Sequence, residues 1–144
     1  MTPRFTGVYL LDASALLAYA GDEAGAGRVE HLLRAAQKGE CQALISSLSV
    51  QESCSEVWFK EGEEAARLFY GRLARLPLQT VGMDDQLLWL ACEIRTTRPL
   101  SMADSWIIAT AKRYQAVLVH KDPIFEQLPL IVPLLSLAAK NGSR

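Results

Sequence analysis

The feature that most constrains this chain is a short apolar run that stops at a carboxylate. Residues 8–19 read VYLLDASALLAY: four apolar residues, then Asp12, then a second apolar stretch after Ser14. A continuous apolar run of this length is typical of a strand that is buried on both faces, as parallel sheets require. Asp12 then lies where the strand ends and a helix begins, the place where open α/β sheets bind ligands. Asp12 is therefore either the N-cap of that helix or a functional carboxylate.

The composition indicates one soluble domain without a dominant charge. The chain has 144 residues, half of them hydrophobic, with 15 basic and 16 acidic residues and a net charge of −1. This length predicts a single domain over residues 1–144 with a full core. The balanced charge gives no general attraction to nucleic acid or to an anionic membrane, so a nucleic-acid site must rest on local features.

The cysteines and the N-terminus favour a cytoplasmic protein. Cys41, Cys54 and Cys92 lie far apart without a CxxC pair, which favours buried thiols in a reducing compartment over a disulfide or zinc framework. The N-terminal apolar stretch is similar to a signal peptide, but Asp12 interrupts it, and we interpret it as core. No apolar run approaches the ~20 residues of a membrane span.

Strand and helix patterns alternate along the chain. Predicted strands cover residues 8–11, 42–46, 78–81 and 117–119, and residues 130–132 can add an edge strand. Predicted helices cover residues 14–20, 25–38, 49–60, 63–76 and 101–114, with a further helix opening at residues 84–85 and a helical turn at 124–127. Ser49 and Glu52 have capping-box spacing, which predicts a helix start near Ser49.

This alternation predicts an α/β fold with a central parallel sheet of four or five strands and helices on both faces. Right-handed crossovers place the first strand in the middle of the sheet. The gap between the first and fourth strands then becomes the topological switch point, where such sheets bind ligands.

Four acidic residues fall at one rim of this sheet. Asp12 and Asp122 follow strands, while Glu52 and Asp104 lie in the predicted first turns of helices. Capping by the helix dipole is the alternative reading for Glu52 and Asp104. If all four converge, each pair at ~5 Å repels by ~3 kcal/mol at an effective dielectric of ~20, and a divalent cation is the natural compensation. Carboxylates without nearby Cys or His select Mg²⁺ or Mn²⁺.

Other chemistries lack their residues. The chain has only two histidines, His31 and His120, which disfavours a two-histidine ribonuclease mechanism. GxxxxGK[ST], GxGxxG and GxSxG motifs are absent. A phosphoaspartyl enzyme with Asp12 as the nucleophile is disfavoured, because the DAS triplet lacks the second Asp of the haloacid-dehalogenase pattern.

Four motifs together resemble one family. In order, LLDASALLAY, SSLSVQES, LSMADSWIIATA and LVHKDPIFEQL resemble the PIN-domain ribonucleases, and most of all their small VapC-type toxins. The resemblance covers nearly the whole chain and implies a PIN fold and a Mg²⁺- or Mn²⁺-dependent endoribonuclease. It makes Asp12, Glu52, Asp104 and Asp122 the catalytic, metal-binding set, and Ser14 matches a Ser or Thr position near the metal. It also implies an RNA substrate, a homodimer and a short antitoxin whose tail blocks the active rim.

The chain departs from the family pattern at two positions near its last acidic residue. His120 stands where Thr is usual, and Ile124 where an acidic or polar residue is frequent. His120 either lines the site or is a solvated side chain at a strand end. Lys121 is a candidate substrate contact, because phosphate contacts dominate RNA affinity, and Lys112 and Arg113 are expected near the same rim.

Two further points stay open at this stage. The aromatic residues Trp58, Phe59, Phe69 and Tyr70 form either an apolar groove for a partner helix or part of the core, with core packing expected for at least half of them. A PIN-fold nuclease of ordinary RNA processing and an inactive PIN-fold binding module are the alternatives to a toxin.

Overall fold

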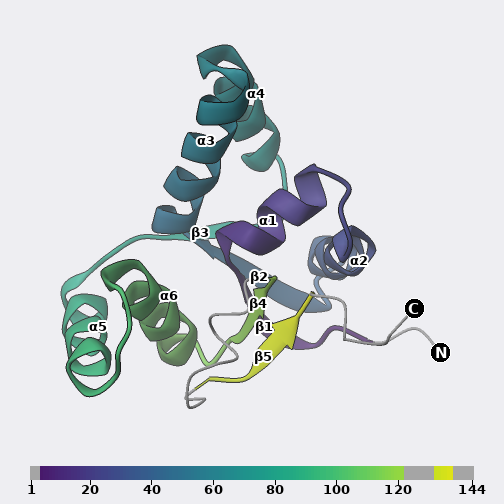
Figure 1. Ribbon diagram of the computed structural model, residues 1–144. Coiled ribbons are helices and arrows are strands. Elements are labelled where there is room, and N and C mark those ends of the chain that lie inside the picture. The colour runs from purple at the N-terminus through teal and green to yellow at the C-terminus, as the bar shows by residue number, and fades with distance from the viewer. Residues whose placement is uncertain (1–3, 122–131, 138–144) are drawn as a thin grey trace, which may run out of the picture.

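The computed structural model describes residues 4–121 and 132–137, and its centre is a five-stranded parallel sheet (Figure 1). The strand order is β3-β2-β1-β4-β5. The strands are β1 (Gly7–Leu11), β2 (Cys41–Ser46), β3 (Gln79–Val81), β4 (Val117–His120) and β5 (Leu134–Ser136). The helices are α1 (Ala13–Ala20), α2 (Ala26–Gln37), α3 (Ser47–Glu61), α4 (Glu63–Leu73), α5 (Asp85–Thr97) and α6 (Met102–Arg113). The predicted α/β class and the central place of the first strand are confirmed.

β1 lies between β2 and β4, and every strand pair is parallel. The chain moves from β1 to β2 and β3 on one side, then returns to β4 and β5 on the other side. The direction of winding therefore reverses between β1 and β4. This is the predicted switch point, and Asp12 directly follows β1 there.

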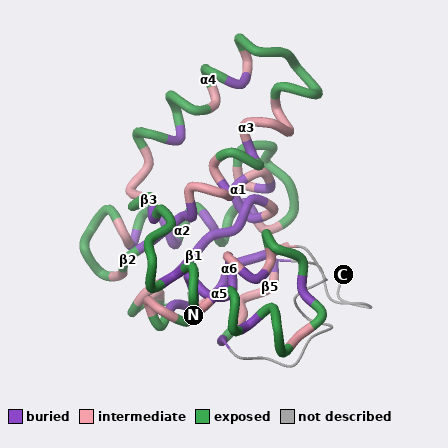
Figure 2. The backbone as a smooth tube through the Cα atoms, turned by 90° about the vertical axis from the view of Figure 1, so that its left-hand side faces the viewer, coloured by how far each residue is buried: buried purple, intermediate pink, exposed green. Residues whose placement is uncertain are grey.

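Successive residues of β1 face opposite layers of the molecule. Leu10 packs in a core with Ile94 of α5 and Ile108 of α6. Leu11, its neighbour, packs in a second core with Ala15 of α1 and Leu32 of α2. Both leucines are fully buried, and buried stretches of backbone run through the centre of the molecule (Figure 2). The period-two alternation of a strand therefore accounts for helices on both faces, as predicted.

α3 and α4 form a paired arm that stands away from the sheet (Figure 1). Gly62 connects the two helices with φ +97° and ψ 172°, a backbone conformation that is essentially restricted to glycine. Only Ser49 and Ser53 of α3 are fully buried. The base of the arm is anchored by a small core in which Leu73 packs with Ile45 of β2 and Leu16 of α1.

Some predicted element boundaries are wrong. α3 begins at Ser47, because the Oγ of Ser46 accepts a hydrogen bond from the N–H of Leu48 at 3.1 Å and caps the helix. The predicted capping box at Ser49 therefore does not exist. The described edge strand is β5, which begins after Pro133, where the N–H of Leu118 donates to the carbonyl of Pro133. Of the predicted edge strand at residues 130–132, Val132 is not in a strand, and residues 130 and 131 lie outside the described residues. The predicted turn at residues 124–127 lies outside the described residues.

The remaining sequence expectations are met in part. No helix in residues 4–121 or 132–137 is long and apolar enough to cross a bilayer. All three thiols are free, but Cys92 is exposed and Cys41 and Cys54 are only partly buried, so the prediction of buried cysteines is wrong. The predicted helix over residues 63–76 ends earlier, at Leu73.

Candidate active site

Asp12 is fixed at the junction of β1 and α1. Its backbone N–H donates to the carbonyl of Val119 on β4 at 3.1 Å, and its Oδ1 accepts from the N–H of Ala15 at 2.9 Å. The residue is 6% exposed. Asp12 is thus an N-cap, one of the two alternatives from the sequence, and it is also a buried carboxylate at the switch point. Capping does not exhaust its role, since an exposed cap would serve α1 equally well.

Ser14 connects Asp12 to the end of β4. Its hydroxyl donates to Oδ1 of Asp12 at 2.7 Å and accepts from the N–H of Lys121 at 2.8 Å. The first residue after β4 is therefore held against the first turn of α1. The Nζ of Lys121 in turn forms an ion pair with Oε1 of Glu23, 3.1 Å away, in the turn between α1 and α2.

Glu52 and Asp104 come from the helices that flank this junction. Glu52 was predicted in the first turn of its helix, but α3 starts at Ser47, so Glu52 lies in the second turn. The residue is exposed. Asp104 is partly buried in the first turn of α6. The cap of α6 is the hydroxyl of Ser101, which accepts from the N–H of Asp104 at 3.0 Å. The carboxylate of Asp104 is therefore not needed as the cap.

The topology places these three acids toward one edge of the sheet. Asp12 follows β1, α3 follows the carboxyl end of β2, and α6 runs back to the amino end of β4, so that its first turn points toward the carboxyl edge. Asp122, the fourth predicted ligand, lies outside the described residues. Within those residues no group of three Asp, Glu, His or Cys side chains is gathered closely enough to hold a metal ion. The convergence of the full set stays a prediction.

The residues at the end of β4 differ from one expectation. His120 is fully buried, so the alternative of a solvated side chain is wrong. Its carbonyl accepts from the N–H of Leu137, because β5 continues along this edge of β4. Lys112 and Arg113 lie in the last turn of α6, at the opposite end of that helix from Asp104, and Arg113 is paired with Asp84. Their expected place at the rim is wrong.

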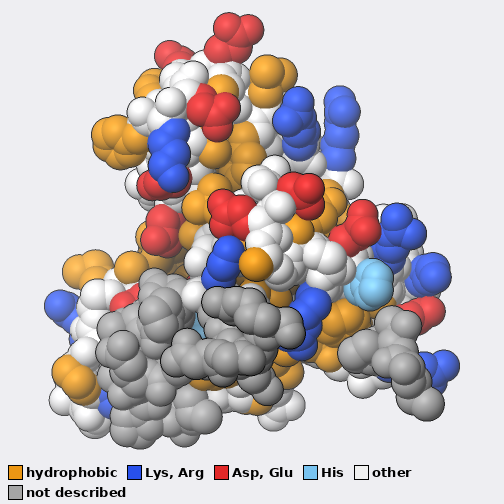
Figure 3. Space-filling view, turned by 45° about the vertical axis from the view of Figure 1, so that its right-hand side comes forward, with side chains coloured by type: hydrophobic (Ala, Val, Ile, Leu, Met, Phe, Trp, Pro, Cys, Tyr) orange, Lys and Arg blue, Asp and Glu red, His pale blue; other side chains and the backbone are white. Residues whose placement is uncertain are grey.

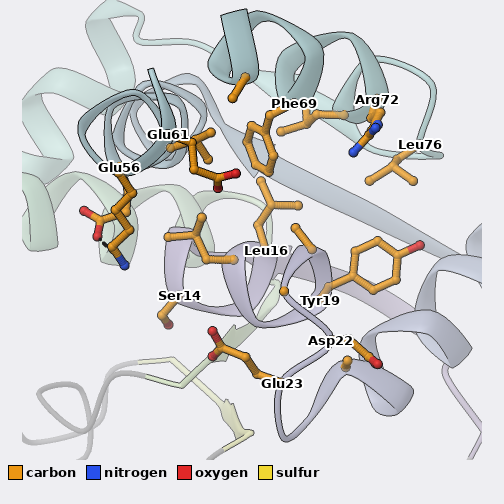
Figure 4. A pocket seen from close by; sticks show the side chains of 18 of the residues that line it. Ser14, Leu16, Tyr19, Asp22, Glu23, Glu56, Glu61, Phe69, Arg72 and Leu76 are labelled. Carbon is orange, nitrogen blue, oxygen red and sulfur yellow. Dashed lines mark ion pairs between the residues drawn. The ribbon is translucent and has the colours of Figure 1, made fainter. Parts of the chain in front are cut away.

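A groove of about 1280 Å³ runs between α1 and α2 on one side and the α3–α4 arm on the other. Leu16 of α1 and Phe69 of α4 point toward each other across it (Figure 4). Ser14, Glu23 and Lys121 are also part of its lining. The groove therefore reaches the Asp12 junction. In the space-filling view, acidic and basic side chains stand among hydrophobic ones over this face (Figure 3).

The four aromatic residues of the arm divide differently from the prediction. Phe69 is partly buried and lines the groove. Trp58, Phe59 and Tyr70 are exposed. The expectation that at least half of the four pack in the core is therefore wrong, because the arm extends beyond the body of the molecule. The sequence analysis did not identify Glu23 as a residue of this site, because no local pattern around it indicates an ion pair with Lys121, which is distant in the sequence.

Comparison with known proteins identifies the fold. A family model described as PIN domain matches residues 9–130. A chain of VapBC2 from Rickettsia felis, solved with a promoter DNA fragment, is 18% identical, with 90% of this chain and 98% of that chain covered and a TM-score of 0.73. VapBC-1 from nontypeable Haemophilus influenzae gives 18% identity, coverage of 90% and 98%, and a TM-score of 0.70. VapC20 from Mycobacterium tuberculosis, a sarcin-ricin loop cleaving toxin, is 14% identical, with 83% of this chain and 93% of that chain covered and a TM-score of 0.62.

At these identities the solved structures show a shared fold. A comparison with curated proteins finds no significant match. The family model, however, spans most of the chain, from the last three residues of β1 through all six helices and β4. The chain belongs to the PIN-domain family.

Proposed function

We propose that the protein is a Mg²⁺- or Mn²⁺-dependent endoribonuclease and the toxin of a toxin–antitoxin pair, active in the cytoplasm. The observation that carries this proposal is Asp12: a buried carboxylate at the switch point of a PIN fold, held in one orientation by Ser14. Burying a carboxylate at the end of a strand is unfavourable without compensation. A cation-binding role accounts for its place, and the position of Asp104, whose helix is already capped by Ser101, agrees with the same role.

The chemistry of the donors fits a hard divalent cation. Asp12, Glu52, Asp104 and Asp122 would hold it through carboxylate oxygens, the ligands that Mg²⁺ and Mn²⁺ prefer. Such an ion, when bound, orients and activates water for in-line attack on a phosphodiester. The protein's own part is to fix the ligands: Ser14 and Ala15 both donate to Oδ1 of Asp12 and prevent its rotation.

The substrate proposal rests on the family and on one named relative. VapC20, a structural neighbour, is a sarcin-ricin loop cleaving toxin. RNA is therefore the preferred polymer for this chain as well. The same geometry would serve a PIN nuclease of ordinary RNA processing, and cleavage alone does not distinguish that role from a toxin. An inactive binding module is disfavoured, because all four acidic positions are retained in the sequence.

An antitoxin is the partner that the groove fits. Other structural neighbours are chains of VapBC complexes. The groove offers apolar side chains from both walls, including Leu16, Leu68 and Phe69, which an amphipathic segment could cover. One end of the groove is lined by Ser14. A segment bound there would cover the Asp12 junction and block the access of RNA to it.

A homodimer is the proposed assembly of the protein itself. Three large apolar side chains are exposed in or just before α5, namely Met83, Leu88 and Trp89. Large exposed apolar side chains that lie near one another in the sequence favour an interface. Light scattering of the isolated protein should report a dimer, and a strict monomer at tens of micromolar would contradict this part of the proposal while leaving the nuclease untouched.

Cleavage of a labelled RNA with Mn²⁺, and again with EDTA, tests the central claim. Asp12→Asn and Asp104→Asn should each lower the rate at least ~100-fold, because each keeps its shape and loses the charge that holds a cation. The matched control is Glu63→Gln with Glu64→Gln, two exposed acids at the tip of the arm, which should change little. Products should have 5′-phosphate and 3′-hydroxyl ends. Activity that persists in EDTA, or 2′,3′-cyclic phosphate ends, would exclude the mechanism.

A further inference from the structure

The ion pair between Lys121 and Glu23 lies next to the candidate active site. Lys121 is the first residue after β4, and its N–H is bonded to Ser14, which in turn contacts Asp12. Its Nζ lies 3.1 Å from Oε1 of Glu23. Lys121, Glu23 and Ser14 all line the same end of the groove. A cation at this point is placed to meet a phosphate that approaches Asp12.

The two partners are held to different degrees. The side chain of Lys121 is 30% exposed, so most of its aliphatic stem is covered by the protein. The side chain of Glu23 is 57% exposed. The stem of the lysine is therefore placed mainly by packing, whereas the glutamate is the partner that can move away at little cost. An ion pair with this exposure contributes little to stability.

We infer that Glu23 is an internal counter-ion that an RNA phosphate displaces from Lys121, and that it lowers the affinity of the site for RNA. The inference rests on the proposed RNA-cleaving function. A phosphate carries the same charge as the carboxylate and more acceptor oxygens, so the lysine can exchange one for the other. As long as Glu23 is present, the pair as a whole is neutral and contributes little net attraction.

This arrangement affects specificity. A lysine–phosphate contact carries no sequence information, because every nucleotide has the same phosphate. Weakening that contact lowers the affinity for all RNA equally. A larger share of the total affinity must then come from contacts that distinguish one RNA from another. Glu23 is in this sense a specificity-determining residue that touches neither the base nor Asp12.

Binding of a fluorescently labelled single-stranded RNA, measured by anisotropy in EDTA, tests the inference without cleavage. Glu23→Gln should bind roughly three- to fivefold more tightly than the wild type at low salt, the equivalent of an exposed ion pair. The advantage should fade as salt is added. In the wild type the lysine exchanges a carboxylate for a phosphate, whereas in Glu23→Gln it neutralises a phosphate without freeing a carboxylate. The slope of log Kd against log salt should therefore steepen by up to about 0.7.

Two controls separate this effect from a change in net charge. Glu40→Gln removes the same charge from an exposed residue just before β2, at the amino edge of the sheet, and should leave Kd and its salt slope unchanged. In a Lys121→Met background, whose side chain keeps the buried stem, Glu23→Gln should no longer tighten binding. Tighter binding in that background, or none in the wild-type background, would overturn the inference.

The outcome also separates the inference from the proposed function. If Mn²⁺-dependent cleavage occurs and Glu23→Gln binds RNA no better than the wild type, the inference is wrong and the nuclease stands. If RNA binds with the expected dependence on Glu23 but is not cleaved with Mn²⁺, the nuclease proposal fails and the counter-ion stands. Absence of RNA binding by every variant contradicts both.

Discussion

The hydroxyl of Ser14 donates to Oδ1 of Asp12 over 2.7 Å while it accepts the N–H of Lys121 over 2.8 Å. One side chain in α1 thereby orients a carboxylate at the end of β1 and holds the residue that follows β4. Two neighbouring strands of the sheet are thus locked at the point where the candidate site lies.

Ser14→Ala should reduce RNA cleavage about tenfold, equivalent to ~1.4 kcal/mol, because Asp12 loses one of the two donors to Oδ1. Loss of the hydroxyl should also lower the free energy of unfolding by ~1 kcal/mol. Ser14→Thr keeps the hydroxyl and should recover most of both. Chemical denaturation and initial cleavage rates measure the two effects. A cleavage rate for Ser14→Ala equal to that of the wild type would show that the orientation of Asp12 is set elsewhere.

Asp104→Asn should leave the fold intact or slightly more stable, since the carboxylate is not the cap of α6 and, on the proposed convergence of the acids, its charge repels the others. Ser101→Ala is the matched comparison. It removes the observed cap and should lower the free energy of unfolding by ~1 kcal/mol. A large loss of stability in Asp104→Asn, seen in thermal melts in EDTA, would instead make Asp104 a structural residue.

Mn²⁺ at millimolar concentration should raise the Tm of the wild type, because an ion that binds only the folded state stabilises it. The rise should be smaller in Asp104→Asn and in Asp12→Asn, which each lose one ligand charge. Differential scanning fluorimetry with and without Mn²⁺ measures it. Equal shifts in all three proteins would place the ion elsewhere, and no shift in any of them would count against a metal site.

The ion pair between Asp84 and Arg113 should make stability depend on acid pH. The side-chain hydrogen bond from Arg113 holds the pKa of Asp84 below its usual value, and the N–H of Leu87 adds to this. A carboxyl with a lowered folded-state pKa stabilises above its unfolded pKa of about 3.9, and that contribution is lost as the pH falls through the folded pKa. Asp84→Asn should therefore flatten the fall of Tm below about pH 4.

The control for this prediction is Asp85→Asn. Asp85 is the exposed neighbour of Asp84 in the first turn of α5, and it forms no ion pair within the described residues. Its substitution should preserve the wild-type dependence of Tm on pH. If Asp84→Asn and Asp85→Asn give identical curves from pH 7 to pH 3, the pair with Arg113 is not the source of the acid sensitivity.

Gly25→Ala should destabilise the fold by about 1–3 kcal/mol. Gly25 has φ +96°, which is strained for any side chain, and a Cβ there would come within 2.8 Å of the Cβ of Leu137. Gly27→Ala, two residues later in α2, has open space and ordinary helical geometry. It should stabilise by up to about 1 kcal/mol. Opposite signs for two glycine-to-alanine changes in urea unfolding would confirm the backbone assignment at this turn.

Much of the fold could be predicted because the signals are local. The apolar run before Asp12 indicated β1, and the alternation of patterns gave the parallel sheet with β1 in its centre. The start of α3 was misplaced because SSLSVQES offers several serines that can cap a helix. The choice of Ser46 depends on where β2 ends beside β1, a matter of tertiary pairing.

The site was predictable as a set of residue types but not as a network. Asp12 and Asp104 were found by their positions at the ends of apolar segments. The burial of His120 was not foreseen, because its place beside β5, where it pairs with Ser136, depends on tertiary pairing between distant parts of the chain. The ion pair between Glu23 and Lys121 joins two charged residues that are far apart in the sequence, and neither has a local signal that marks a partner. The packing of α1 against β4 brings them together.

The position of β1 also determines when a growing chain can first complete the Asp12 junction. β1 is synthesised before its neighbour β4, which pairs with it through Val117 to Val119. Asp12 and Ser14 take their bonds from that late strand and from Lys121. Since synthesis proceeds from the N-terminus, the junction stays incomplete until β4 has emerged from the ribosome. A chain that stops before β4 therefore lacks the hydrogen bonds that fix the Asp12 junction.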